Sequence, residues 1–447
     1  MYRDKAVRVN RIRSLADQPG MLCCAPSEIA KVSRSIGGQE IASVSLANGT
    51  VPGTPYHAER ARSAIARVRP HWARMGITRV ANVTGLDRIG IPVVMVCRPN
   101  ARSLAVSQGK GIDLESAMAS GLMEAAELYH AEHIERPLKL GSMAELSGSH
   151  RFAEIGRLPR ITGRAFTRDV VTLWIEGREM ISGEPRWLPF ESVRANFTVP
   201  PPPGSGFFDC SSNGLASGNT ADEAIHHGIC EIVERDATAL WNQRSSARRR
   251  RTGIDLGSAP DGPCRDVLKK LENADFDVAA WETTTDLGVP AFFCLIADRR
   301  DRNSHYGIGA AAHPVPETAL LKAIIEAAQV RTTYVSAARD DLTAEEYEEE
   351  YREKRRRRAE KLLAERSAPR RVASAAGRAT QDVAQNVAWL IERLQAAGVS
   401  EVITVDLAKE DIGLPVVRVV IPGLEGPDDH DAYVPGERAR RMAQEGQ

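Results

Sequence analysis

The stretch Ser212–Ala237, which reads SNGLASGNTADEAIHHGICEIVERDA, decides how the middle of this chain folds. It begins with Ser212-Asn213-Gly214, a turn signal that ends a loop. From about Ala221 to Leu240, apolar residues recur with the 3.6-residue period of an amphipathic helix and share one face. That face would be buried, and it holds Ile225, Ile229, Ile232 and Val233.

The opposite face of this predicted helix gathers acidic residues that lack counter-charges. Arg235 is the only strong base between Thr220 and Leu240, and like charges at helical spacing destabilise a helix unless a cation offsets them. Mg²⁺ prefers carboxylates and water, and phosphates commonly complete its shell. The sequence therefore predicts a metal–nucleotide site, with an ordinary solvated helix face as the alternative. The polar positions that share the face are Asn219, Glu223, Glu231 and Glu234.

A second predicted helix, at about Leu114–His133, repeats the same pattern. It contains SGLMEAAE, in which Ser120 precedes a pair of glutamates three residues apart, Glu124 and Glu127. Each Glu-x-x-Glu helix follows a loop that contains glycine. The repetition suggests two related halves around one site.

Strands alternate with helices along the chain, which predicts an α/β fold with mixed sheets. Apolar and β-branched runs predict strands at 91–97, 170–175, 277–281, 290–297, 401–407 and 416–421. Further helices are expected at 58–67 and 316–335, and loops at 107–111 and at the proline-rich 199–206. We expect an N-terminal region over 1–75 and one domain over 76–447. An exposed charged helix and a linker would occupy about 342–380.

Composition excludes several classes of protein. The 447 residues include 59 basic and 59 acidic ones, so no overall field favours nucleic acid or an anionic membrane. Apolar runs are too short for a transmembrane helix and no secretory signal is apparent, so we expect a cytoplasmic protein. The 7 cysteines contain no Cys-x-x-Cys pair, which predicts reduced thiols and no zinc site.

Familiar nucleotide-binding and catalytic motifs are missing from the sequence. Neither the P-loop pattern nor G-x-G-x-x-G after a strand is met, so a nucleotide site would have to be built from the acidic helices. The third helix, 316–335, presents Lys322, Glu326 and Gln329 on one polar face, with Arg331 further round. No nucleophile–base arrangement can be placed. As general base, His313 and Glu326 are the two candidates.

Three long stretches resemble the YcaO family, and the resemblance extends over about Gly76–Gly423. They are TRVANVTGLDRIGIPVVMVCRPNARSLAVSQGKG (78–111), SNGLASGNTADEAIHHGICEIVERDA (212–237) and AAHPVPETALLKAIIEAAQVRTTYVSAARDD (311–341). The resemblance implies a YcaO-type fold that binds ATP without a P-loop, because glutamates on helices hold Mg²⁺ against the phosphates.

The resemblance also assigns residues by position. The first family signature matches at Ser120, Glu124 and Glu127, but Leu128 stands where arginine is usual. The implied metal ligands are Glu124, Glu127, Glu231 and Glu234. The implied ATP-binding residues are Lys110, Ser120, Glu124, Ser212, Asn219, Glu223, Arg235, Gln329 and Arg331.

The activity that the resemblance implies is ATP-dependent activation of a peptide backbone amide. A sulfide donor would give a thioamide, and a neighbouring Cys, Ser or Thr side chain of the substrate would give an azoline. The segment from Val434 to Gln447 lacks the P-x-P-x-P tail of azoline-forming members, which favours a thioamide made with a TfuA-type partner. The expected partners are a peptide or protein substrate and a second copy of the chain. A non-catalytic ATP-binding accessory protein and an amino-acid adenylating ligase are the alternatives.

Overall fold

The computed structural model describes residues 55–161, 163–301, 303–372, 377–378, 382–428 and 432–444. The chain divides into two units, Met1–Asn48 and Gly49–Gln447, and the described residues all belong to the second. Most of the expected N-terminal region, 1–75, therefore lies outside the described residues. Its last part forms the helix α3 (Pro55–Val68) and the short α4 (Trp72–Met75), and the boundary at 75 stays a prediction.

The first sheet has three antiparallel strands in the order β1-β2-β3. They are β1 (Arg79–Asn82), β2 (Val93–Cys97) and β3 (Val106–Lys110). The central β2 is almost completely buried, as its continuous apolar run predicts. Helix α5 (Leu114–Glu132) packs against β3 and β2, and α3 packs against α5.

The second three-stranded sheet is also antiparallel, in the order β11-β10-β9. Its strands are β9 (Phe276–Glu282), β10 (Ala291–Asp298) and β11 (Gly307–Ala312). Helix α10 (Pro316–Ser336) covers this sheet along β11 and β10, and α9 (Pro263–Asn273) packs against α10 and β9. Parallel pairing occurs between the short β8 (Ile254–Asp255) and β12 (Arg370–Arg371).

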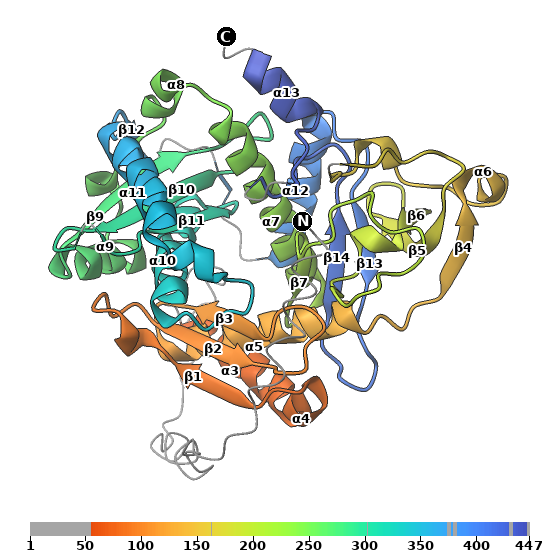
Figure 1. Ribbon diagram of the computed structural model, residues 1–447, viewed down its shortest axis with the longest axis horizontal. Coiled ribbons are helices and arrows are strands. Elements are labelled where there is room, and N and C mark those ends of the chain that lie inside the picture. The colour runs from red at the N-terminus through yellow and green to blue at the C-terminus, as the bar shows by residue number, and fades with distance from the viewer. Residues whose placement is uncertain are drawn as a thin grey trace. The chain divides into compact units, whose positions relative to one another are not determined.

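The largest sheet has the order β4-β5-β13-β14-β7, with β6 paired to β5. Its strands are β4 (Leu138–Ser142), β5 (Val171–Glu179), β6 (Pro185–Pro189), β7 (Leu215–Ser217), β13 (Ile403–Asp406) and β14 (Val416–Val420). Helix α7 (Ala221–Asn242) packs against β14 and β7, and α12 (Val383–Ala396) packs against α7. The predicted mixed α/β class is confirmed (Figure 1), although the strands form several antiparallel sheets.

The prediction of a loop at Ser107–Gly111 is wrong, because residues Val106–Lys110 form strand β3. The reason lies in Gly109. A Cβ at this position would lie 1.9 Å from the carbonyl oxygen of Ala117 in α5, so only glycine lets this strand and helix approach so closely. Gly309 of β11 repeats the arrangement, since its Cβ would lie 2.2 Å from the Ala323 oxygen in α10.

The charged segment near 345–366 is helical, as expected, but the helix α11 begins at Glu349 and ends at Ala364. A short 3₁₀ turn, Ala344–Tyr347, precedes it. Six of the described α-helices were not predicted from the sequence: α4, α6 (Met143–Leu146), α8 (Ser246–Arg250), α9, α12 and α13 (Glu437–Gln444). The proline-rich 199–206 is irregular, as predicted.

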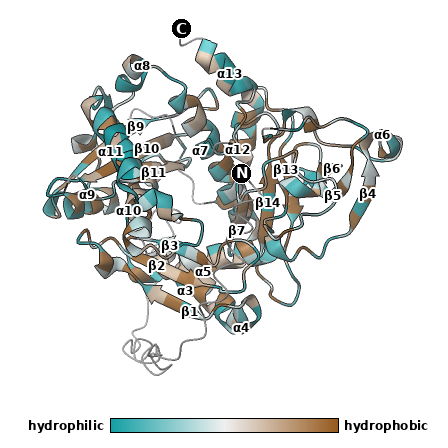
Figure 2. Cartoon of the chain, in the orientation of Figure 1, coloured by the Kyte–Doolittle hydropathy of each residue, from teal (hydrophilic) through white to brown (hydrophobic). Residues whose placement is uncertain are grey.

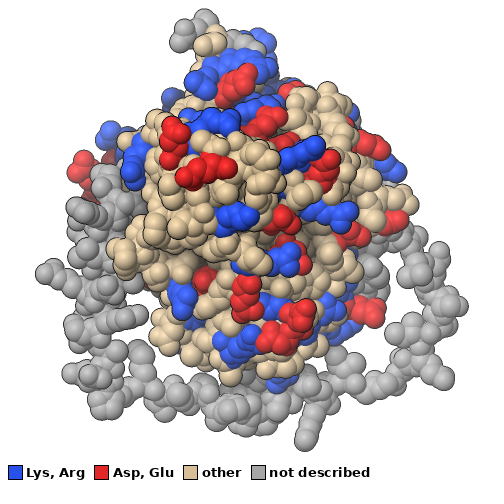
Figure 3. Space-filling model, turned by 90° about the vertical axis from the view of Figure 1, so that its right-hand side faces the viewer, with Lys and Arg blue, Asp and Glu red and all other residues tan. Residues whose placement is uncertain are grey.

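Hydrophobic residues concentrate on the strands and on the helix faces toward them, while α8 and α13 are largely hydrophilic (Figure 2). Leu128 is 3% exposed and belongs to the core cluster that includes Trp174 and Ile175. On the face drawn in Figure 3, basic and acidic side chains are interspersed. Among the described helices, none is long and apolar enough to cross a membrane.

Candidate functional site

Five glutamates from three helices come together where α5, α7 and α10 approach one another. Figure 1 shows the lower ends of α7 and α10 above β3 and α5, and β3 contacts both α5 and α10. The glutamates are near enough to act on one another electrostatically: Glu124 on Glu127, and Glu231 on both. Glu326 of α10 acts in the same way on Glu231 and Glu234. The fold thus gathers the acidic residues that the sequence singled out.

The carboxylates of this group are difficult to ionise. Burial, and then repulsion from Glu124 and Glu231, raises the pKa of Glu127 to about 8. Burial is also the main cause that raises the pKa of Glu124 to about 7 and that of Glu234 to about 8. The pKa of Glu231 is raised for the same reason. A bound cation would restore the charged forms of these groups.

Several basic side chains lie beside the acidic group. The Lys110 ammonium of β3 is 2.9 Å from Oε2 of Glu326. Burial opposes the charge on Lys110, but Glu326, Glu234 and Glu124 together hold its pKa above the ordinary value. Arg235 lies 3.8 Å from Glu234 and 4.0 Å from Glu231. Lys110 and Arg235, both expected to bind ATP, thus lie beside the acidic group.

Ser217, which the sequence reasoning missed, fixes one of the carboxylates. Its backbone N–H and its hydroxyl both donate to Oε1 of Glu127, at 2.8 and 2.6 Å. Ser217 ends β7, and β7 contacts α5, so the sheet positions this carboxylate directly. The only sequence signal was a serine just before the Gly218-Asn219 turn.

Glu223 forms hydrogen bonds and an ion pair at the start of α7. Its side chain accepts from the backbone N–H of Asn219 at 2.9 Å, while its own N–H donates to Thr220 Oγ1 at 3.2 Å. The bond to Thr220 caps the helix, and the bond from Asn219 ties the preceding turn to the same carboxylate. Arg60 of α3 also pairs with Glu223 at 2.8 Å. Asn219 keeps a buried side-chain oxygen without a hydrogen-bond partner, which leaves an acceptor for a ligand.

The other predicted residues occupy different environments. Ser120 is half-buried on α5, one turn before Glu124, and Ser212 is exposed in the loop before β7. Nε2 of Gln329 donates to the backbone oxygen of Gln108 at 3.1 Å, and Oε1 of Gln329 is buried without a partner among the described residues. Arg331 does not reach the acidic group, because it is held by Asp87 at 2.5 Å and Asp298 at 3.4 Å.

Both predicted candidates for a general base already have a hydrogen-bond or ion-pair partner within the protein. Nδ1 of His313 accepts from the backbone N–H of Val315 at 3.0 Å, and burial with the charge of Lys322 lowers the pKa of His313 well below the ordinary value. His313 is only 4% exposed. Glu326 is paired with Lys110.

The donor set fits Mg²⁺ bound together with a nucleotide. Within the described residues, no three His, Cys, Asp or Glu side chains are arranged to hold a metal ion by themselves. Mg²⁺ differs from most metals in this respect, because it is usually bound by one or two carboxylates together with waters and substrate phosphates. Half-buried glutamates with raised pKa values and unpartnered amide oxygens are suitable groups for such a site.

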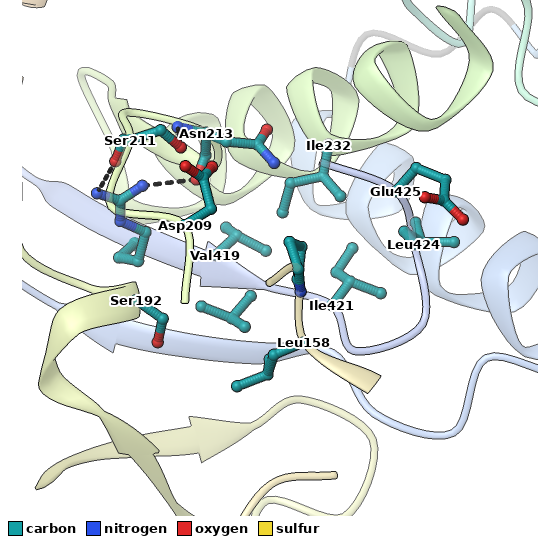
Figure 4. A pocket seen from close by; sticks show the side chains of 13 residues that line it. Leu158, Ser192, Asp209, Ser211, Asn213, Ile232, Val419, Ile421, Leu424 and Glu425 are labelled. Carbon is teal, nitrogen blue, oxygen red and sulfur yellow. Dashed lines mark hydrogen bonds between the residues drawn. The ribbon is translucent and has the colours of Figure 1, made fainter. Parts of the chain in front are cut away.

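A small cavity of about 40 Å³ is lined by residues of α7, β14 and the 209–213 loop (Figure 4). The buried Arg418 spans one side of it, donating to the backbone oxygens of Asn213 at 2.6 Å and Ser211 at 2.8 Å. A cavity of this size holds a few waters at most. Arg418 therefore serves to fix the loop that leads into β7 and α7.

The family model described as YcaO cyclodehydratase, ATP- and Mg²⁺-binding, matches residues 108–425. A protein of the tfuA 3′ region of Rhizobium leguminosarum bv. trifolii is 35% identical over 80% of this chain and 86% of its own length. A Methanothermobacter thermautotrophicus protein is 30% identical over 78% of this chain and 90% of its own.

Solved structures show the same fold at low sequence identity. YcaO from Methanopyrus kandleri, bound with AMPPCP and Mg²⁺, superposes with a TM-score of 0.63 at 23% identity, over 82% of this chain and 91% of its own. A heterocyclase in complex with substrate and cofactor gives 0.67 at 23% identity over 87% of this chain. The chain spans about half of that heterocyclase, 54% of its length.

Proposed function

The chain belongs to the YcaO family, an ATP- and Mg²⁺-binding family, and from that premise we propose that it activates a peptide backbone amide and converts it to a thioamide. The sulfur would come from a sulfide donor, and a TfuA-type protein would act as partner. The observation that carries the proposal is the group of glutamates that α5, α7 and α10 bring together.

Each part of the site has a role in this reaction. Mg-ATP, when bound, supplies the γ-phosphoryl group that makes the amide oxygen a leaving group. Glu124, Glu127, Glu231 and Glu234 are proposed to hold the metal. Lys110 and Arg235 would screen the charge of the phosphates, since Arg235 lies beside Glu231 and Glu234 and Lys110 interacts electrostatically with Glu234 and Glu124. No covalent nucleophile of the protein is required.

Two observations favour a thioamide over an azoline. The relative at 35% identity is encoded in a tfuA 3′ region. In addition, the segment 432–444 is tied to the rest of the fold: Glu425 accepts from Tyr433 and Gly436 at 2.8 Å each, and Arg438 pairs with Asp236 at 2.9 Å. A segment anchored in this way is unsuited to the role of a mobile tail that enters the site.

An azoline-forming cyclodehydratase is the second candidate. The description of the family model and the heterocyclase among the structural neighbours favour it. The E. coli microcin synthetase McbBCD complex with pro-MccB17 bound also shares the fold, with a TM-score of 0.54 at 15% identity. These similarities concern the fold and do not identify the nucleophile that attacks the amide.

The test is the intact mass of a peptide encoded beside this gene, after incubation with the full chain, a TfuA-type partner, Mg-ATP and sulfide. The expected result is a mass gain equal to the replacement of one oxygen by sulfur. A mass loss equal to one water would show that the product is an azoline instead of a thioamide. Glu231→Gln should abolish either product while keeping the fold, with the exposed Glu115→Gln as control. If the peptide mass is unchanged and no ATP is consumed, the proposal that the protein is an enzyme is refuted and an accessory role is favoured. Release of AMP and pyrophosphate would indicate an adenylating ligase.

A further inference from the structure

His227 differs from its neighbours on α7. It is exposed, whereas His226 and Gly228 on either side of it are buried. It lies one helical turn after Glu223 and one turn before Glu231, so it shares their face. An imidazole therefore reaches solvent between the helix cap and the acidic group.

One hydrogen bond determines which nitrogen of His227 carries the proton. Nδ1 lies 3.3 Å from the backbone oxygen of Ser217. A carbonyl oxygen can only accept, so Nδ1 must be the donor, and in a neutral ring the lone pair is then on Nε2. No partner of Nε2 occurs among the described residues.

The same serine also holds the acidic group. While its carbonyl accepts from His227, its N–H and hydroxyl donate to Glu127 at 2.8 and 2.6 Å. A single residue at the end of β7 thus fixes both the imidazole and a proposed metal ligand. Nε2 of His227 is thereby placed on the same side of α7 as the carboxylates.

The surroundings keep this imidazole neutral. Burial by neighbouring atoms, then the charges of Lys322 from α10, His226 on the same helix and Arg60 from α3, lower the pKa of His227 well below the ordinary value. The residue is nevertheless exposed, so solvent or a substrate can reach it. The neutral ring has an open lone pair that can accept a proton, and the lowered pKa makes it a weaker base than an ordinary imidazole.

The other histidines near α7 lack this combination. Nδ1 of His313 already accepts from Val315, and the residue is buried. His226 is 4% exposed and lies against His313 and Cys230, with its Nε2 3.9 Å from the Cys230 sulfur.

We propose that His227 is the general base of the reaction, with Nε2 taking the proton of the attacking nucleophile. The inference rests on the proposed function and adds a catalytic residue to it. As the S–H bond of the sulfur nucleophile breaks, its proton moves to Nε2 and its electron pair forms the new S–C bond. The carbonyl π pair then moves to the amide oxygen. No oxidant or reductant is needed, and the same step serves a sulfide or a substrate thiol.

The test is His227→Gln in the full chain, because glutamine retains an N–H donor for the Ser217 carbonyl but has no base. We expect kcat to fall about 10²- to 10⁴-fold, while the Kd for Mg-AMPPCP changes by less than about threefold. Added imidazole should restore part of the rate. The control is His150→Gln, which removes an imidazole that contacts Lys139 of β4 and should leave both parameters unchanged.

A measurement that needs no turnover accompanies the kinetics. ¹⁵N NMR of the histidine side chains, assigned with the His227→Gln variant, should show the Nδ1–H form and no protonation of His227 at neutral pH. An Nε2–H form, or a charged ring at neutral pH, would overturn the proposal even if the chain proved inactive. A kcat of the variant within about threefold of wild type would overturn the assignment of His227 as general base. So would a fall in nucleotide affinity that accounts for the whole loss of activity. Neither result would refute the proposed function.

Discussion

Replacing Glu127 by glutamine should make the metal-free protein more stable at alkaline pH. The pKa of Glu127 is raised from 4.5 to about 8, mainly by burial. Because the folded state then holds its proton more tightly than the unfolded state, stability falls as the pH rises from about 4.5 to about 8. The glutamine side chain is neutral at every pH, so the variant does not lose stability in this way.

The magnitude follows from the same values. Each unit of pKa is worth about 1.36 kcal/mol, which sets an upper limit near ~5 kcal/mol for full ionisation. Glu127 is only half-buried, and solvent screening brings the expected gain for Glu127→Gln to about 2 kcal/mol at pH 8.5. The glutamine oxygen can still accept both hydrogen bonds from Ser217.

Urea denaturation with chelator, at about pH 5 and about pH 8.5, measures the effect. The variant should match wild type at the lower pH and exceed it at the higher one. With saturating Mg-AMPPCP the order should reverse, because wild type gains ligand stabilisation that the variant has lost. Glu132→Gln on the same helix is the matched control: this carboxylate is paired with Arg98 at 2.5 Å, so its loss should destabilise the protein at both pH values.

A Glu127→Gln protein that is less stable than wild type at alkaline pH without Mg²⁺ would refute the reasoning. So would a gain of equal size at the two pH values, because the effect would then not come from ionisation.

Three further results are expected. Gly309→Ala should cost more than about 3 kcal/mol in urea denaturation or prevent folding, since the new Cβ would meet the Ala323 oxygen, whereas Gly85→Ala, with nothing within 4 Å, should be nearly neutral. Leu128→Arg, which restores the residue usual in the family, should destabilise the fold by about 3 kcal/mol or more, because the position is 3% exposed in the core; a stable variant would contradict that placement. Chelation of Mg²⁺ at pH 8.5 should weaken AMPPCP binding by calorimetry at least about 100-fold, and equal affinity with and without chelator would contradict the proposed site.

The sequence predicted the acidic helices well, because their pattern is local. The spacing of Glu124 and Glu127, and of Glu231 and Glu234, can be read within one helix, and α5 and α7 begin where expected. What the spacing could not show is which helices meet. That depends on long-range packing, and it is packing that adds Glu326 of α10 to the group.

Two strands that contain glycine are among those that the sequence analysis missed. β3 (VSQGK) and β11 (GIGAAA) have few β-branched residues, so local propensity argues against strands. Their glycines are required by a helix that crosses them, which is a tertiary requirement. Arg331 illustrates the same limit at the site: its partners Asp87 and Asp298 are far away in sequence, so its salt bridges could not be anticipated.

The exposure of His227 was also beyond the sequence. Two adjacent histidines, His226 and His227, look alike in the pattern, and only the fold separates the buried ring from the open one. Their difference depends on the end of β7 and on the helices α3 and α10, which approach α7 from distant parts of the chain.

The glycine contacts of β3 with α5 and of β11 with α10 have a mechanical consequence. Backbone lies against backbone at Gly109 and Gly309, with no side chain between strand and helix that could change rotamer. Sliding either helix along its strand would bring main-chain atoms into collision, so each pair must move as one rigid piece. The spacing of Glu124 and Glu127 relative to β3 would then stay constant when other parts of the chain move.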